Sequence, residues 1–201
     1  MKTPPDMAYE AQYVKRWSML STTADSTVAS HSFNVAILAM AIHRKMMNTI
    51  PISIYELCYY AVLHDIEEVY TGDIPTPTKV KMRELGFDPN EMSDCPCPEV
   101  QPTGMIRDII KIADLIDNWF WIKNHGTGGR SFAVANEVHG RLLVAMAGAG
   151  ADLRAGAQKV IQYIQGRTSN EEGERKRFAQ DRERRVSTDR HFRSAIPCIV
   201  D

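Results

Sequence analysis

The sequence lacks long hydrophobic runs and carries almost no net charge, and each of these absences argues against certain classes of protein. No apolar stretch reaches the roughly 18 residues that a helix needs to cross a bilayer, so we expect no membrane span. The 24 Lys and Arg residues nearly balance the 25 Asp and Glu residues, which gives a formal net charge of -1. A basic nucleic-acid binder or a membrane-surface protein is therefore not expected.

Cysteine is scarce as well, with four in 201 residues. Cys95 and Cys97 stand one residue apart, and a lone pair at that spacing more often has no role than clips a metal ion. Without a disulfide framework, a reduced cytoplasmic setting is the simpler expectation. Residues 1–6 are polar and include two prolines, so we expect no signal peptide.

Strand patterns are nearly absent, whereas apolar residues recur at helical spacing over most of the chain. This pattern and the chain length predict an all-α helical bundle with one core over residues 1–166. We expect a proline-rich loop at 86–103, a charged C-terminal extension at 167–201 and a proline turn at 71–77. The predicted helices cover residues 7–20, 28–48, 53–70, 104–125 and 131–165, the last with a break near 148–150.

A histidine and an aspartate, His64 and Asp65, follow directly on an apolar helical run. Burying such groups is costly unless something compensates them, and a divalent cation suits both. His31 stands at the head of another apolar helix, and Asp114 lies in the middle of a third. This nitrogen and oxygen set predicts a catalytic divalent ion with open coordination positions, for which zinc, cobalt and manganese are candidates.

Two adjacent glutamates follow the doublet. Glu68 is four residues after His64 and three after Asp65, so on one continuous helix it shares their face. We therefore predict Glu68 as the base that takes a proton from the attacking water, and Glu67 as a solvated or supporting acid. Asp73, in the turn beyond, is a second candidate acid, although a capping role is more common for such an aspartate.

An anionic substrate also needs cations. Arg16 on the first predicted helix and Lys79 after the proline turn are candidates for phosphate, although lone cations are usually just solvated. Trp17 is a candidate for stacking on a sugar or base, with a core position as the alternative; Trp119 and Trp121 are expected in the core. The remaining histidines have no acidic partner at a suitable spacing: His43, His125, His139 and His191.

Four segments, in order, carry a family resemblance: 16–19 (RWSM), 28–32 (VASHS), 64–69 (HDIEEV) and 71–77 (TGDIPTP). With Asp114, they make the stretch from Val14 to Trp121 resemble the HD-domain metal-dependent phosphohydrolases. Within these, the pattern is similar to the bacterial 5'-deoxynucleotidases and the phage dATP triphosphohydrolases. One departure is Ser30, where many relatives carry glutamate before the histidine.

The resemblance implies an all-helical HD bundle and a role for each motif residue. Arg16 and Lys79 would hold phosphate, and Trp17 would help to exclude a ribose 2'-hydroxyl. Glu68 and Asp73 would serve the hydrolytic step. The divalent ion would be held by His31, His64, Asp65 and Asp114.

The predicted reaction is hydrolysis at the 5'-phosphate of a 2'-deoxynucleotide, which leaves the deoxynucleoside. We favour a dATP triphosphohydrolase, with a 5'-deoxynucleotidase acting on monophosphates as a near-equal alternative. A phosphodiesterase or alarmone hydrolase is less expected, and a non-catalytic, metal-stabilised interaction module is the rival from another class. The expected partners are a small deoxynucleotide and further copies of the chain, in the cytoplasm of a bacterium or a phage-infected host.

Overall fold

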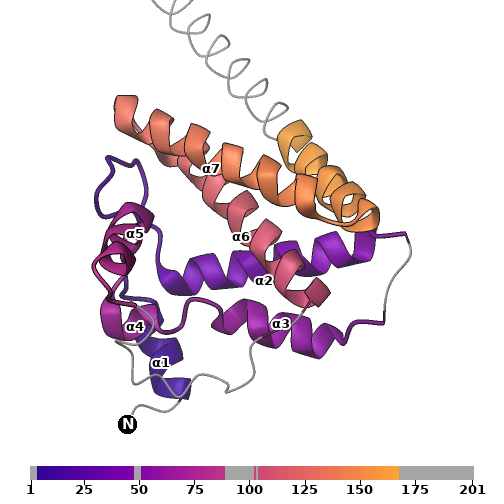
Figure 1. Ribbon diagram of the computed structural model, residues 1–201, viewed down its shortest axis with the longest axis horizontal. Helices are drawn as coiled ribbons and strands as arrows, with labels where there is room; N and C mark the ends of the chain where they lie inside the picture. The colour runs from indigo at the N-terminus through magenta and orange to yellow at the C-terminus, as the bar shows by residue number, and fades with distance from the viewer. Residues whose placement is uncertain (1–3, 48–50, 89–101, 103, 168–201) are drawn as a thin grey trace, which may run out of the picture. The chain divides into compact units, whose positions relative to one another are not determined.

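The computed structural model describes residues 4–47, 51–88, 102 and 104–167. Within these ranges no strand forms, and only two isolated β-bridges occur, Lys15 with Thr27 and Thr22 with Gly126. The all-α prediction is therefore confirmed (Figure 1). The labelled helices are α1 (Pro4–Ala11), α2 (Val28–Lys45), α3 (Ile54–Leu63), α4 (Glu68–Thr71), α5 (Thr76–Glu84), α6 (Gly104–His125) and α7 (Gly128–Gly148).

The core lies where α2 packs against α3 and α6, while α7 packs along α6 (Figure 1). Its most deeply buried side chains are branched aliphatics from all of these helices, among them Ile42, Leu57, Ile112 and Leu142. Their burial removes apolar surface from water and so fixes α2 and α6, which carry His31 and Asp114, and α3, which ends at the turn that carries His64 and Asp65. Ala149, just after α7, interrupts the helical run, so the predicted break near 148–150 is confirmed.

The first predicted helix, over 7–20, is wrong beyond Ala11, where α1 ends. Residues 12–27 form a loop instead, closed by the amide of Arg16 on the carbonyl of Ser26 at 2.9 Å. The amide of Val28 bonds to the carbonyl of Val14 at 3.0 Å in the same way. Residues 12–20 do not form a helix because the tertiary contacts of the loop outweigh their weak helical propensity.

The third predicted helix, over 53–70, is also wrong as one continuous element. α3 ends at Leu63, residues 64–67 form a turn, and α4 begins at Glu68. The amide of Glu68 bonds to the carbonyl of Asp65, three residues back, at 3.0 Å. This hydrogen-bond pattern has about three residues per turn, so residues three apart stay on one face.

The predicted turn at 71–77 is partly correct. Gly72 follows α4 with a positive φ of 72°, a conformation that glycine adopts without strain. The sequence did not predict the helix that follows: α5 begins at Thr76, with Pro77 at its second position. Proline fits there because the first helical amides have no partner within the helix.

Several predictions fall outside the described residues. These include most of the 86–103 loop and nearly all of the 167–201 extension, with their cysteines and His191. By internal contacts the chain divides into units 1–160 and 161–201, so the predicted boundary at 166 stays a prediction. Among the described residues, no helix is long and apolar enough to cross a bilayer.

Candidate active site

Three of the four predicted ligands meet at one point. His31 comes from the first turn of α2, and His64 and Asp65 come from the turn that follows α3. The Nε2 atoms of the two histidines are 3.3 Å apart, and Asp65 Oδ2 lies 3.5 and 3.4 Å from them. One donor atom from each residue lies within 4.8 Å of the others, the spacing that a bound cation needs.

Asp114, from α6, approaches the same point. Its Oδ1 lies 3.3 Å from Nε2 of His31, which is 1% exposed. A hydrogen bond from His31 and the charge of Lys111 hold the pKa of the Asp114 carboxyl below its usual range, although burial opposes them. Two nitrogens and two carboxylates at one place suit a divalent cation of the zinc, cobalt or manganese type.

The second nitrogen of each histidine is also held. Nδ1 of His64 lies 2.7 Å from the carbonyl of Ala61, which fixes the proton on that nitrogen and leaves the lone pair of Nε2 available to a cation. Nδ1 of His31 lies 2.7 Å from Oδ2 of Asp117, whose other oxygen accepts from Asn34 at 3.0 Å. The sequence analysis missed Asp117, although its position three residues after Asp114 on one helix was a usable signal.

The carboxylates around His31 favour its protonated form. Burial and the nearby charge of Arg16 lower its pKa, but hydrogen bonds to Asp114 and Asp117 outweigh them and raise that pKa to about 9. A ligating histidine must be neutral, so cation binding at this point releases the proton. The carboxylates that favour the proton are the same ones that would favour the cation.

Ser30, the departure from the family pattern, has a local role. Its side chain accepts from the amide of Thr27 at 3.0 Å, while Thr27 Oγ1 accepts from the amide of Ser30 at 3.2 Å. This reciprocal capping box begins α2 and fixes the turn that carries His31.

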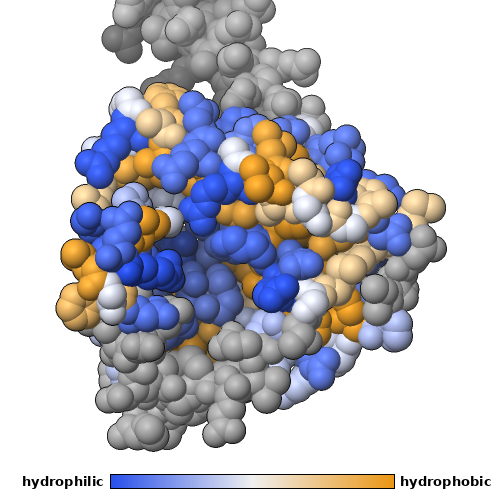
Figure 2. Space-filling view, viewed as in Figure 1, coloured by the Kyte–Doolittle hydropathy of each residue, from blue (hydrophilic) through white to orange (hydrophobic). Residues whose placement is uncertain are grey.

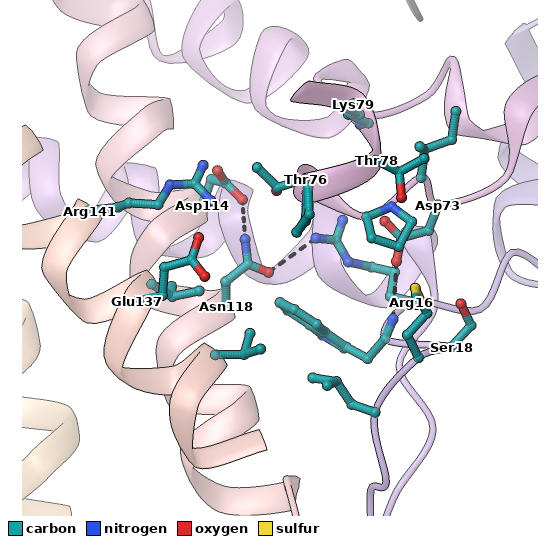
Figure 3. Close-up of a pocket in the computed structure, with 18 of the residues that line it drawn as sticks. Arg16, Ser18, Asp73, Thr76, Thr78, Lys79, Asp114, Asn118, Glu137 and Arg141 are labelled. Carbon is teal, nitrogen blue, oxygen red and sulfur yellow. Dashed lines mark hydrogen bonds between the residues drawn. The ribbon is translucent and has the colours of Figure 1, made fainter. Parts of the chain in front are cut away.

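Arg16 reaches the cluster from the loop at 12–27, not from a helix. Its Nη1 donates to Asp65 Oδ2 at 2.7 Å, and its side chain is 7% exposed. Nη2 donates to Asn118 Oδ1 at 3.1 Å, and Asn118 Nδ2 donates to Asp114 Oδ1 at 2.6 Å (Figure 3). Sequence analysis missed Asn118, which joins the arginine to a candidate ligand.

The two glutamates differ in burial and in their position relative to the pocket, and their predicted roles stay predictions. Glu68 is 3% exposed and lines the pocket beside Asp65, whereas Glu67 is half-buried outside the lining. The three-residue turn, rather than a continuous helix, brings Glu68 under Asp65. Burial and the charge of Asp65 raise the pKa of Glu68 to about 7, although the positive charges of Arg16 and Lys79 lower it. Lys79 Nζ also donates a hydrogen bond to Glu68 Oε1 at 2.9 Å.

Trp17 and Asp73, which also line the pocket, are joined by a hydrogen bond. The amide of Trp17 donates to Oδ2 of Asp73 at 3.0 Å (Figure 3). Trp17 is half-buried, and its ring stacks on Trp121 with centroids 6.2 Å apart. The expectation that Trp119 and Trp121 belong to the core is wrong in degree, since both are half-buried.

Asp65 and Asp114 of the cluster line one pocket of about 430 Å³, together with Arg16, Trp17 and Glu68; the two histidines lie outside this lining. Its face of the molecule is hollowed and mostly hydrophilic (Figure 2). The lining also includes cations from α5, α6 and α7 that sequence analysis missed: Arg83, Lys111, Arg130 and Arg141. Lys111 pairs with Asp114 at 3.2 Å, while the three arginines pair with no acid among the residues described.

Comparison with known proteins agrees with this geometry. Residues 6–92 match the family model described as 5'-deoxynucleotidase YfbR-like. The chain is 35% identical over 147 residues to the dATP triphosphohydrolase of Salmonella phage PMBT28, covering 69% of this chain and 73% of that protein. It is 32% identical over 76 residues to the 5'-deoxynucleotidase of Shewanella oneidensis, covering 36% and 38% respectively.

A solved structure supports the same fold. The HD phosphohydrolase of cyanophage S-2L, solved with dA and one catalytic Zn2+ ion, has a TM-score of 0.65 and 20% identity. The match covers 85% of this chain and 98% of that one. The fold and the histidine and aspartate cluster therefore define an HD-domain phosphohydrolase. More particularly, the chain belongs to the branch of bacterial 5'-deoxynucleotidases and phage dATP triphosphohydrolases.

Proposed function

We propose that this enzyme hydrolyses 2'-deoxynucleoside 5'-triphosphates, with dATP preferred. Water attacks the phosphorus nearest the sugar, the bond to O5' breaks, and the deoxynucleoside leaves with the proton while triphosphate is released. The observation that carries the proposal is one pocket whose wall includes Asp65 and Asp114, the carboxylates of the candidate metal cluster, and also outer arginines with no acidic partner among the described residues. Similarity to two phage dATP triphosphohydrolases, at 35% and 26% identity, supports the preference.

A divalent cation would be the cofactor. His31, His64, Asp65 and Asp114 would hold it, and the donor set fits, since each histidine has its second nitrogen engaged elsewhere. Such a cation lowers the pKa of water and neutralises charge on a phosphoryl oxygen. The cyanophage structure contains one catalytic Zn2+ ion, which supports zinc as the first metal to test.

The chain's own residues would then divide the work. Glu68 would accept the proton of the attacking water, which suits a buried carboxyl whose pKa is raised to about 7. Lys79, bonded to Glu68 at 2.9 Å, would hold that carboxyl in place and turn toward phosphate when substrate enters. Asp73, predicted to serve the hydrolytic step, would act there by fixing the backbone of Trp17.

Phosphate and sugar would meet the loop residues. Arg16 keeps one buried donor, Nε, with no hydrogen-bond partner among the described atoms, and a phosphoryl oxygen that displaced its covering atoms would satisfy this donor. The half-buried ring of Trp17 forms part of the pocket wall beside it. An aromatic ring against C2' of the sugar leaves a 2'-hydroxyl neither space nor a hydrogen-bond partner.

The choice between triphosphate and monophosphate depends on the outer cations. Arg16 and Lys79 suffice for one phosphate, whereas Arg83, Arg130 and Arg141 add three charges without an acidic partner among the described residues. Unpaired cations in a pocket favour a substrate with more negative charge. A 5'-deoxynucleotidase acting on monophosphates is the second candidate, because the family model bears that description.

The test is a substrate panel. The purified protein, loaded in turn with Zn2+, Co2+ or Mn2+, is incubated with dATP, dADP, dAMP, the other deoxynucleotides and ATP. Release of deoxyadenosine and inorganic triphosphate from dATP is the expected result. Turnover of dAMP alone would establish the second candidate. A metal-loaded protein that turns over none of them would support an interaction module instead.

We further propose that the enzyme is a cytoplasmic homo-oligomer that acts on free nucleotides and not on nucleic acid. α2 and α3 pack together, and both expose large apolar side chains, including Phe33 at 64% and Val62 at 46%. Exposed apolar groups of this kind are common where subunits meet. Light scattering on the purified chain should give a mass above one subunit, and oligonucleotides should stay uncleaved.

A further inference from the structure

Trp17 has a backbone conformation that a bulky residue rarely adopts. Its φ is 62°, and it is the only residue other than glycine with a positive φ in the described part of the chain. The Cβ atom makes this left-handed region unfavourable, so it persists only where surrounding contacts enforce it. The contacts that hold Trp17 in this conformation therefore indicate which side chain the loop must position.

Backbone contacts hold the loop on both sides of Trp17. Its amide donates to Asp73 Oδ2 at 3.0 Å, and its carbonyl accepts from the amide of Leu20 at 2.9 Å. Farther along, the amide of Thr23 bonds to the carbonyl of His125 at 2.8 Å, which ties the loop to the end of α6. These bonds fix the main chain, but they leave the side-chain torsions of Trp17 free.

The indole ring has a support of its own. Trp121 stacks on it with centroids 6.2 Å apart and planes within 9° of parallel. Trp17 lines the pocket whereas Trp121 does not, so Trp121 packs behind the ring and faces no substrate. On its other side, Trp121 contacts the ring of His125 at 5.2 Å, which limits its own movement.

The position of Trp121 along α6 explains the arrangement. Asp114, Asn118 and Trp121 are spaced by four and three residues, so they form one stripe on the helix. Asp114 belongs to the candidate metal cluster, Asn118 holds Arg16, and Trp121 holds Trp17. The adjacent loop residues Arg16 and Trp17 thus contact neighbouring residues of this stripe. These two contacts set the distance from the candidate metal cluster to the indole ring of Trp17.

We propose that Trp121 is a positioning residue that holds the ring of Trp17 against the sugar and thereby sets the preference for deoxynucleotides over ribonucleotides. This inference rests on the proposed function, in which Trp17 excludes the 2'-hydroxyl. Trp121 acts only through Trp17. Without it, the ring turns into the space behind and the 2'-hydroxyl fits.

The test compares two tryptophans of α6. Trp121→Ala removes the support, while Trp119→Ala is the matched control, because Trp119 is also half-buried but stacks on His139 at 4.2 Å, away from the pocket. The ratio of kcat/KM for dATP to that for ATP is measured with each metal-loaded enzyme. We expect the ratio to fall about tenfold in Trp121→Ala, chiefly through faster ATP hydrolysis, because excluding one hydroxyl has a limited effect.

Further variants separate positioning from folding. Trp121→Phe keeps a flat ring behind Trp17 and should retain most of the dATP to ATP ratio. Trp17→Ala should bring that ratio close to one. An equal loss of turnover on dATP and ATP in Trp121→Ala, with the ratio kept, would overturn the inference alone, as would the same drop in Trp119→Ala. Wild-type enzyme that hydrolyses ATP as readily as dATP would overturn both the inference and the sugar selection in the proposed function.

Discussion

The two ends of the pocket are built differently. At the metal end, His31 and Asp114 stand on the long helices α2 and α6, whose inner faces carry fully buried aliphatics. At the end that we propose binds the sugar, called the sugar end below, Arg16 and Trp17 stand on the loop at 12–27 and depend on side-chain contacts with α6. The metal end inherits its geometry from the core, whereas the sugar end keeps its geometry through a few local contacts.

This difference has a functional consequence. Moving His31 or Asp114 requires moving a core helix, and Asp65 is tied to the same cluster, so the metal end tolerates little change. A loop held by an amide and an aromatic stack changes shape at much lower cost. We therefore expect substitutions at the metal end to abolish turnover, and those at the sugar end to change which nucleotide is used.

The largest expected effect is loss of the cation. Asp65→Ala and His64→Ala should each reduce metal content and turnover together, by about 10³-fold in rate, because the cation contributes several kcal/mol to the transition state. Elemental analysis and dATP turnover are measured on the same samples. His43→Gln, on α2 but outside the cluster, is the control and should keep both. A full metal complement in the two alanine variants would refute the ligand assignment.

The next effect distinguishes adjacent glutamates. Glu68→Ala should keep the metal but reduce kcat by roughly 10²–10⁴, the usual contribution of general-base catalysis. Glu67→Ala should stay close to wild type, since Glu67 lies outside the pocket lining. Single-turnover rates and metal content are the measurements. If Glu67→Ala has the larger effect, the position of Glu68 next to Asp65 does not identify it as the general base.

The metal end was largely predictable from the sequence, and the sugar end was not. His31, His64 and Asp114 interrupt apolar helical patterns, where an uncompensated polar group is conspicuous. The turn at 64–67 was missed because three-residue and four-residue turns have nearly the same local sequence preferences. The predicted position of Glu68 near Asp65 holds in both geometries, and its role as the base stays a prediction.

The loop residues show why the rest was inaccessible. Arg16 and Trp17 lie in a segment that looks amphipathic, yet Tyr13 and Met19, which give it that look, are 77% and 54% exposed. Their partners Asn118 and Trp121 are ordinary residues of an amphipathic helix, and their role depends on a contact made about a hundred residues along the chain. No local pattern encodes such a contact.

Arg16 is proposed to bind phosphate, which dATP and ATP share, so its removal should reduce binding of both nucleotides without changing sugar choice. Arg16→Ala should lower kcat/KM for dATP and ATP alike by about 10–100-fold, the loss expected for hydrogen bonds between charged groups. Lys15→Ala, which breaks only an exposed pair with Asp25, is the control. A change in the dATP to ATP ratio in Arg16→Ala would show that the two ends are not separable.

Asn118 tests whether the hydrogen-bonded link from Arg16 to Asp114 matters. Asn118→Ala deprives Arg16 and Asp114 of a partner each and should weaken metal affinity about tenfold, as expected for a residue that orients a ligand. Chelator competition measures this directly, without reference to turnover. Asn124→Ala, exposed on the same helix, should leave the affinity unchanged. An unaltered affinity in Asn118→Ala would mean that core packing alone orients Asp114.

The smallest expected effect belongs to the outer arginines. Arg141 comes from α7 and reaches toward Asp114 across the pocket from Lys79 (Figure 3). It pairs with no acid among the described residues, so a phosphate beyond the first is its natural partner. Arg141→Ala should raise the KM for dATP roughly fivefold, within the range of one partly exposed charged contact, and leave any dAMP turnover unchanged.

Steady-state kinetics on both nucleotides decide the matter, because a general loss of stability would change them equally. Arg154→Ala is a poor control, since Arg154 bonds to the carbonyl of Met146 at 2.9 Å and supports the end of α7. Arg107, exposed on α6 and outside the pocket lining, is the better match. If Arg141→Ala raises the KM for dAMP as much as for dATP, the outer arginines do not discriminate between a monophosphate and a triphosphate. The monophosphate would then be the better candidate substrate.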